Sequence, residues 1–246
     1  DIEVKNNLNF TQGIVTTGLN HIFVSNSSST TAITGYDNTK FINGTLRQAI
    51  TTNTDVYTMP IADGTSFTNY KKIDLLNDNL TGVSYIDASV SSVTEGGNNT
   101  DAKFENGAAL VMFGNKLLNR IVGEGVWELI PDVAPTGGTY GVRLYLENLT
   151  ELSDANDNTF TVVKRPDNSN KYADFGFESS DRDNQMPDLS EDGRIYDGGA
   201  GYAERIGFTG FSDFAIAIST NDAILPIELL SFDATLKDNL VHVKWS

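Results

Sequence analysis

The chain has 246 residues, which is enough for one large β domain or two small ones. Its 17 Lys and Arg against 33 Asp and Glu give a formal net charge of −16, which disfavours nucleic acid and anionic membrane surfaces as partners and favours a soluble protein outside the cell. The absence of cysteine excludes disulfides, thiol nucleophiles and Cys-ligated metal sites, and no apolar run approaches the ~20 residues of a membrane span.

Residues 1–52 are rich in Asn, Thr, Ser and Gly and contain short apolar segments such as Ile22-Phe23-Val24 and Phe41-Ile42. Short strands joined by small polar turns are typical of stacked rungs of a β-solenoid or of the first strands of a sandwich. A set of terminal rungs would bury its open end against the next domain. The segment Thr45 to Ile50 is helix-like but too short to form a stable helix alone.

The predicted strands become longer over residues 53–222, and turns rich in Gly, Asn and Asp, such as Gly137-Gly138, separate them. This spacing indicates an all-β sandwich of the Ig-like or jelly-roll-like kind. The clearest alternation of the middle section is Val142-Arg-Leu-Tyr-Leu146. We predict strands at 56–61, 71–76, 83–90, 108–113, 126–130, 142–146, 159–163, 202–208 and 211–218.

Residues 223–246 have the pattern of a β-hairpin. Apolar and polar residues alternate from Leu230 to Leu236, Lys237-Asp238-Asn239 has turn chemistry, and a second alternation follows. One apolar face of this C-terminal hairpin is the predicted assembly contact, and its residues are Leu230, Phe232, Val241, Val243 and Trp245.

Motifs near the C-terminus occur in the same order in a known group of proteins. Phe211-Ser-Asp-Phe-Ala-Ile216, Leu225-Pro-Ile-Glu-Leu-Leu-Ser-Phe-Asp-Ala234 and Val241-His-Val-Lys-Trp-Ser246 resemble the last strands of large secreted Bacteroidota proteins before their type IX secretion sorting domain. This sequence ends before such a domain. Further resemblances are Phe41-Ile-Asn-Gly-Thr-Leu-Arg47, Tyr57-Thr-Met-Pro-Ile61, Gly125-Val-Trp-Glu-Leu-Ile-Pro131, Pro135-Thr-Gly-Gly-Thr-Tyr140 and Val162-Val-Lys-Arg165.

The resemblance implies a location and an architecture. It implies a secreted or outer cell-surface protein, exported by the type IX machinery through a C-terminal signal that this sequence lacks. It favours the closing rungs of a right-handed β-helix for residues 1–52. It does not imply a particular activity.

Two loops are candidates for Ca²⁺. Asp154, Asn156 and Asn158 occupy positions one, three and five of an EF-hand pattern, but Thr159 and Arg165 replace its Gly and Glu, so an EF-hand is excluded. The densest carboxylate cluster contains Asp181, Asp183, Asp188, Glu191 and Asp192. If that loop folds so that these groups gather, their repulsion requires a cation, whereas a splayed, solvated loop requires none.

No residue pattern requires catalysis. The two histidines, His21 and His242, both fall in predicted strands, and neither is placed beside a nucleophile in the sequence. A glycosidase needs two carboxylates at a fixed separation, and no pair can be selected among 33 acids.

We therefore expect a non-enzymatic extracellular structural or adhesin-like protein that contacts itself or neighbouring surface modules and assembles into a filament or layer. The alternative is a carbohydrate-binding accessory module of a larger secreted enzyme, which predicts aromatic side chains in one plane on an exposed sheet face. A glycan-degrading enzyme is the third hypothesis, and it predicts a cleft with paired carboxylates, one of them with a raised pKa.

Overall fold

The computed structural model describes residues 1–92, 97–98, 112–113, 116–118, 120–152, 160–167, 171–173, 194–197, 200–218, 232–237 and 240–245. Within these ranges the only helical element is the single 3-10 turn η1 (Phe67–Asn69), which the side chain of Ser66 caps. The other regular elements are β-strands. The predicted all-β class is therefore confirmed.

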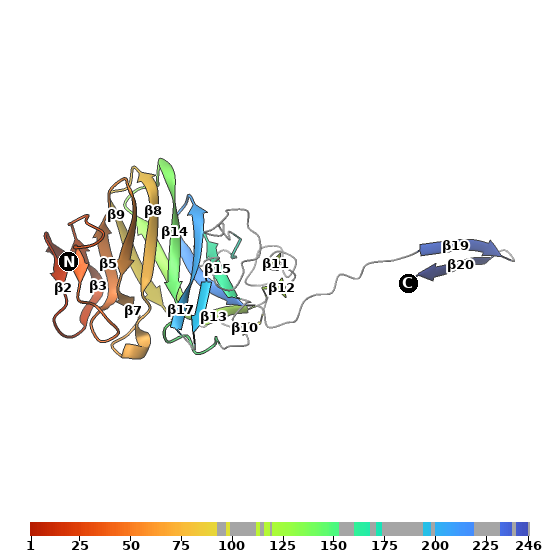
Figure 1. Cartoon of the computed structure of the whole chain (residues 1–246), viewed down its shortest axis with the longest axis horizontal. Helices are drawn as coiled ribbons and strands as arrows, with labels where there is room; N and C mark the ends of the chain where they lie inside the picture. The colour runs from red at the N-terminus through yellow and green to blue at the C-terminus, as the bar shows by residue number, and fades with distance from the viewer. Residues whose placement is uncertain are drawn as a thin grey trace.

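Two large sheets form the body of the molecule (Figure 1). The nine-stranded sheet is mixed, and its strands lie in the order β1 (Ile2–Val4), β3 (Val15–Val24), β5 (Ile42–Ala49), β9 (Tyr85–Ser91), β13 (Arg120–Pro131), β18 (Asp213–Ile218) and β15 (Phe160–Arg165), with β7 (Ile61–Ala62) beside β5 and β10 (Gly97–Asn98) beside β13. The five-stranded sheet is antiparallel, in the order β16 (Arg194–Asp197), β17 (Ala200–Phe208), β14 (Gly137–Tyr145), β8 (Ile73–Thr81) and β6 (Thr54–Met59).

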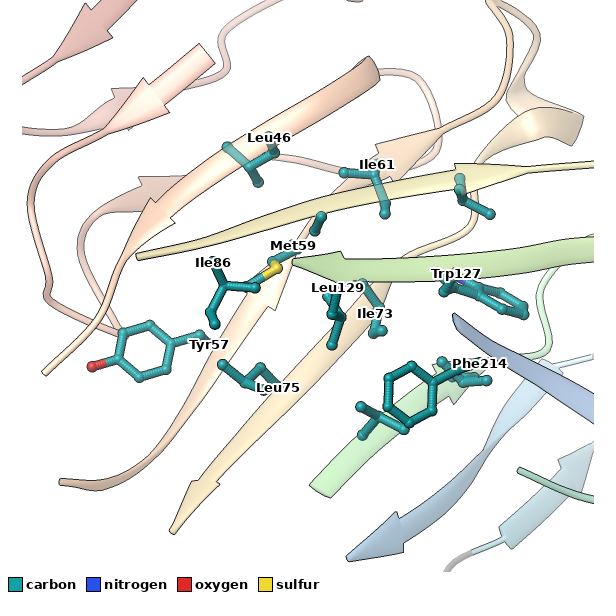
Figure 2. Close-up of a cluster of buried hydrophobic side chains, with 14 of the residues drawn as sticks. Leu46, Tyr57, Met59, Ile61, Ile73, Leu75, Ile86, Trp127, Leu129 and Phe214 are labelled. Atoms are coloured by element: carbon teal, nitrogen blue, oxygen red, sulfur yellow. The ribbon is translucent and has the colours of Figure 1, made fainter. Parts of the chain in front are cut away.

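One hydrophobic core joins the two sheets. In each strand alternate side chains point inward, so the core side chains of β5, β9 and β13 meet those of β6, β8 and β14. Figure 2 shows Leu46, Ile86 and Leu129 near Tyr57, Met59 and Ile73. Trp127 of β13 is fully buried at 0% exposure, and its indole Nε1 donates a hydrogen bond to the backbone oxygen of Lys71 (2.8 Å), which precedes β8.

The N-terminal strands pair in parallel, in contrast to the antiparallel pairs that form most of the rest of the body. Ile2 of β1 lies opposite Ile22 of β3, and β3 pairs with β5 through Val15 and Ile42 and through Ile22 and Leu46. Each next strand therefore follows after 20 to 27 residues. A second parallel pair, β2 (Leu8–Asn9) with β4 (Ile33–Thr34), repeats the arrangement. In the described part of the chain these pairs do not extend into a complete solenoid.

Residues 1–52 and the residues that follow share one sheet, because β5 also pairs antiparallel with β9 through Leu46 and Ala88. The helix-like segment from Thr45 to Ile50 is wrong as a helix: most of it lies in β5, where Leu46 points into the core and Arg47 points out. The predicted turn at Gly137-Gly138 is also wrong, since both residues begin β14.

The C-terminal hairpin is present as β19 (Phe232–Lys237) and β20 (Leu240–Trp245), with Phe232 opposite Trp245 and Leu236 opposite Val241. Among the described strands these two pair only with each other. Residues Met112–Phe113 (β11) and Lys116–Leu117 (β12) form one more small antiparallel pair.

Replacing Trp127 by Ala should lower the free energy of unfolding by about 3–5 kcal/mol, because the change leaves a cavity between the sheets and removes the hydrogen bond to Lys71. Urea denaturation measures the loss. The control is Val56→Ala, at a side chain that is 41% exposed, which should cost under about 1 kcal/mol. A loss below 1 kcal/mol for Trp127→Ala would contradict the shared core.

Candidate functional site

The outer face of the five-stranded sheet, which points away from the core, carries its residues in rows across the strands. Strand register places Arg143 of β14 between Asp74 of β8 and Glu204 of β17. One step along the sheet, Gly141 lies opposite Leu76, and Leu76 lies opposite Val56 of β6. We call the first set the charged row (Asp74, Arg143, Glu204) and the second, with Ile206 of β17, the apolar row (Val56, Leu76, Gly141, Ile206).

The charged row is an ion-pair network. Arg143 Nε and Nη2 bind Glu204 Oε2 at 2.8 and 2.6 Å, and Arg143 Nη1 lies 3.7 Å from Asp74 Oδ2. Asp74 and Glu204 are 2% and 8% exposed, so both carboxylates depend on this guanidinium for compensation. Burial works against the charge of Arg143, but Glu204 and Tyr145 together favour the charge, and the pKa of Arg143 is raised.

Two tyrosines extend the charged row at one end. Tyr145 donates its hydroxyl hydrogen to Asp74 Oδ2 (2.7 Å), and the ring of Tyr202 lies under the Arg143 guanidinium, with Cζ 4.4 Å from the ring centroid. Lys72 Nζ lies 3.7 Å from the centroid of the Tyr145 ring. Burial raises the pKa of Tyr145 and lowers the pKa of Lys72. Each ring therefore already has a cation on one face.

A hollow of about 350 Å³ lies along the apolar row. Val56, Leu76, Gly141 and Ile206 provide much of its lining, and Thr139 and Asp78 stand beside it. Thr139 Oγ1 donates a hydrogen bond to Asp78 Oδ2 (3.0 Å). The hollow therefore combines apolar side chains with hydroxyl and carboxylate oxygens, a composition that suits ligand binding.

The outer face of the nine-stranded sheet has a second, more polar groove of about 230 Å³. Its lining residues come from the β3 bulge and from β5, β9 and β13, and they are Leu19, Asn20, His21, Thr45, Asp87, Ser89, Glu128 and Ile130. Arg47 Nε donates a hydrogen bond to Asp87 Oδ1 (2.7 Å), and Arg47 Nη2 donates one to Asp87 Oδ2 (2.8 Å). Burial raises the pKa of Glu128, and the nearby carboxylates of Asp213 and Asp87 raise it further.

This groove brings together two carboxylates, one with a raised pKa, which is what the glycan-degrading hypothesis predicts. Asp87 is a poor candidate for a glycosidase nucleophile, because Arg47 donates a hydrogen bond to each of its carboxylate oxygens. His21 is the one histidine in the groove. Burial lowers its pKa and Arg47 lowers it further, and its Nδ1 lies 3.3 Å from Asp1 Oδ1.

The calcium candidates all fall outside the described residues; they are Asp154, Asn156, Asn158, Asp181, Asp183, Asp188, Glu191 and Asp192. Leu230 also falls outside, while Phe232, Val241, Val243 and Trp245 lie in the C-terminal hairpin, where Val241 is exposed. His242 lies in β20 opposite Thr235. Over the described ranges, no group of three or more His, Asp or Glu is placed to hold a metal ion.

Of the eight aromatic residues that are candidates for stacking on a sugar, half are core residues. Tyr70, Trp127, Tyr140 and Tyr172 are buried, and Tyr85, Tyr145, Tyr196 and Tyr202 are half-buried. The sequence does not predict the apolar row, because the row depends on Gly141 lying between β8 and β17, and these strands are distant in the chain. The alternation at Val142 to Leu146 was the available signal, since it places Arg143 and Gly141 on one face.

Comparison with protein-family models, with curated proteins and with solved structures finds no match to this chain. In the described part, no helix is long and apolar enough to span a membrane.

Replacing Arg143 by Met should lower the free energy of unfolding at pH 7 by about 3 kcal/mol, because two buried carboxylates lose their counter-charge. Urea denaturation at pH 7 measures this. Arg143→Lys, which keeps the charge, should lose less, and equal losses for Arg143→Met and Arg143→Lys would contradict the network.

Replacing Glu128 by Gln should raise the melting temperature at pH 7 and leave it unchanged at pH 4. The raised pKa of Glu128 means that its ionised form is disfavoured in the folded state, so removing the charge helps only above that pKa. Thermal unfolding over this pH range measures the effect. A lower melting temperature at pH 7 would show that the carboxylate of Glu128 is satisfied in the fold.

Proposed function

We propose that this chain is a non-enzymatic structural, adhesin-like module of an extracellular surface protein, and that neighbouring copies join through the edge of β1. The supporting observation is the parallel arrangement β1-β3-β5, which ends at β1 without a further strand among the described residues. Parallel strands are normally covered on both sides and edges, so an uncovered parallel edge is a place where another strand adds.

The backbone of β1 has the right polarity for such an addition. The N–H of Ser25 donates to the backbone oxygen of Val4 (3.0 Å), so the polar groups of Val4 face β3. Successive residues of a strand direct these groups to opposite sides, so the N–H and C=O of Glu3 face outward. These two groups are what an incoming strand would bind.

The finer architecture of the proposal is a rung-like N-terminal stack over residues 1–52 that continues into a sandwich of the Ig-like or jelly-roll-like kind over 53–222. The spacing of 20 to 27 residues between paired parallel strands supports the rung-like stack. The antiparallel five-stranded sheet that faces the nine-stranded one supports the sandwich. The family resemblance supports a secreted or outer-surface location and export by type IX machinery.

Assembly of so acidic a chain depends on salt. Copies with a net charge of −16 repel each other at low ionic strength, and the repulsion is screened beyond about 8 Å at physiological salt. The proposed assemblies should therefore grow with added salt. The apolar face of the C-terminal hairpin stays a second predicted contact, and removal of residues 225–246 tests it separately.

Replacing Glu3 by Pro should abolish assembly, because proline removes the outward N–H while leaving the groups of Val4 that bind β3. We expect the concentration needed for assembly to rise at least about tenfold. Glu3→Ala keeps the N–H and is the matched control. Light scattering and negative-stain electron microscopy measure assembly. The salt concentration is about 150 mM, at which repulsion between charges is screened beyond about 8 Å.

Two results would overturn the proposal. One is a wild-type chain that stays monomeric across the accessible concentration and salt range. The other is equal assembly by the Glu3→Pro and Glu3→Ala variants, which would place the contact elsewhere.

A further inference from the structure

The hollow over Gly141 owes its shape to close approach of two strands. A Cβ atom built on Gly141 would lie 2.7 Å from the backbone oxygen of Arg205 and 2.7 Å from Ile206 Cγ2. The pairing of β14 with β17 also shifts register between Tyr140 and Val142. No other residue type fits at 141 without displacing β17, because the backbone of Arg205 and the side chain of Ile206 already occupy the space beside Gly141.

The floor of the hollow is apolar and partly exposed. Tyr140 and Val142 point into the core, so Gly141 lies on the outer face between them. Leu76 is only half-buried and Val56 is 41% exposed, although both sit in the interior of their strands. An exposed apolar surface of this kind, bordered by polar groups, is typical of a ligand site.

The charges around the hollow select the kind of ligand. On one side Asp78 and Thr139 supply oxygens. On the other side lies the charged row, where Arg143 is held by Glu204 and Asp74. An anionic ligand would meet carboxylates and a cation that is already paired, and the net charge of −16 adds to that repulsion. The same charge disfavours a second copy of this chain at this face.

We propose that the hollow binds one neutral hexopyranose unit of a glycan. The C–H face of the sugar ring packs on Val56, Leu76 and Ile206, and its hydroxyls donate to Asp78 and to Thr139 Oγ1, whose own hydrogen is donated to Asp78. A pyranose ring matches the site because it has one apolar face and a polar edge, as the site does. The hollow is large enough for a single ring, since ligand pockets begin at roughly 300 Å³.

The proposal is independent of assembly through β1. The apolar row lies on β6, β8, β14 and β17, which belong to the five-stranded sheet, whereas β1 is at the edge of the nine-stranded sheet. The Glu3→Pro variant should bind sugar like the wild type. Failure of sugar binding and failure of assembly are therefore separate results.

The experiment is titration of the ¹⁵N-labelled whole chain with unbranched six-unit oligosaccharides of glucose, mannose and galactose. We expect at least one of them to shift the amide signals of Leu76, Thr139, Gly141 and Ile206. The comparator is an anionic galacturonic acid oligomer, which should bind at least about tenfold more weakly.

Leu76→Gln should weaken the bound oligosaccharide at least tenfold, because the amide replaces the apolar floor with a similar volume. Val133→Gln is the control, at a 53% exposed side chain that lines neither the hollow nor the polar groove, and should bind like the wild type. A dispersed spectrum establishes that each variant is folded. The proposal is overturned if all three neutral oligomers leave these amides unshifted at millimolar concentration, if the shifts map to another face, or if the galacturonic acid oligomer binds more tightly.

Discussion

The indole of Trp127 sits where the two large sheets face each other, and the rest of the structure depends on that contact. Its buried ring packs in the core between the two sheets, and its N–H donates a hydrogen bond to the carbonyl of Lys71, just before β8. Gly125 provides room, because a Cβ there would lie 2.8 Å from the indole ring. With no cysteine in the chain, burial of apolar side chains between sheets is the main source of stability.

Because the inward side chains form the core, the outward side chains of each sheet are available for ion pairs and for binding. On the five-stranded sheet they form the charged row, which ties three strands together, and the apolar row, which leaves a hollow. On the nine-stranded sheet Arg47 and Asp87 connect β5 to β9, so the parallel N-terminal strands are joined to the antiparallel body by an ion pair as well as by backbone bonds. The edge at β1 is one of the sheet edges at which the described strands leave backbone groups without a neighbouring strand, and it is the one proposed for assembly.

Local alternation predicted much of the fold, because a half-buried strand shows its period in sequence. It located the strands around Val142 and Phe214 and the C-terminal hairpin. It failed at residues 45–50, where short-range helical character yields to pairing of Leu46 with Ala88, a contact 42 residues away. The partners of Arg143 and the importance of Gly141 depend on register between distant strands, so sequence alone could not supply them. The carboxylate-rich loops that are the candidates for Ca²⁺ lie outside the described residues.

Amide hydrogen exchange at Glu3 and Val4 tests the central claim most directly, because adjacent residues of β1 report on its two edges. In dispersed chains the account predicts a protected Val4, whose polar groups face β3, and an unprotected Glu3. In assembled material Glu3 should become protected as well. If Glu3 still exchanges freely within assemblies, β1 is not the joining edge and the proposed structural role is wrong.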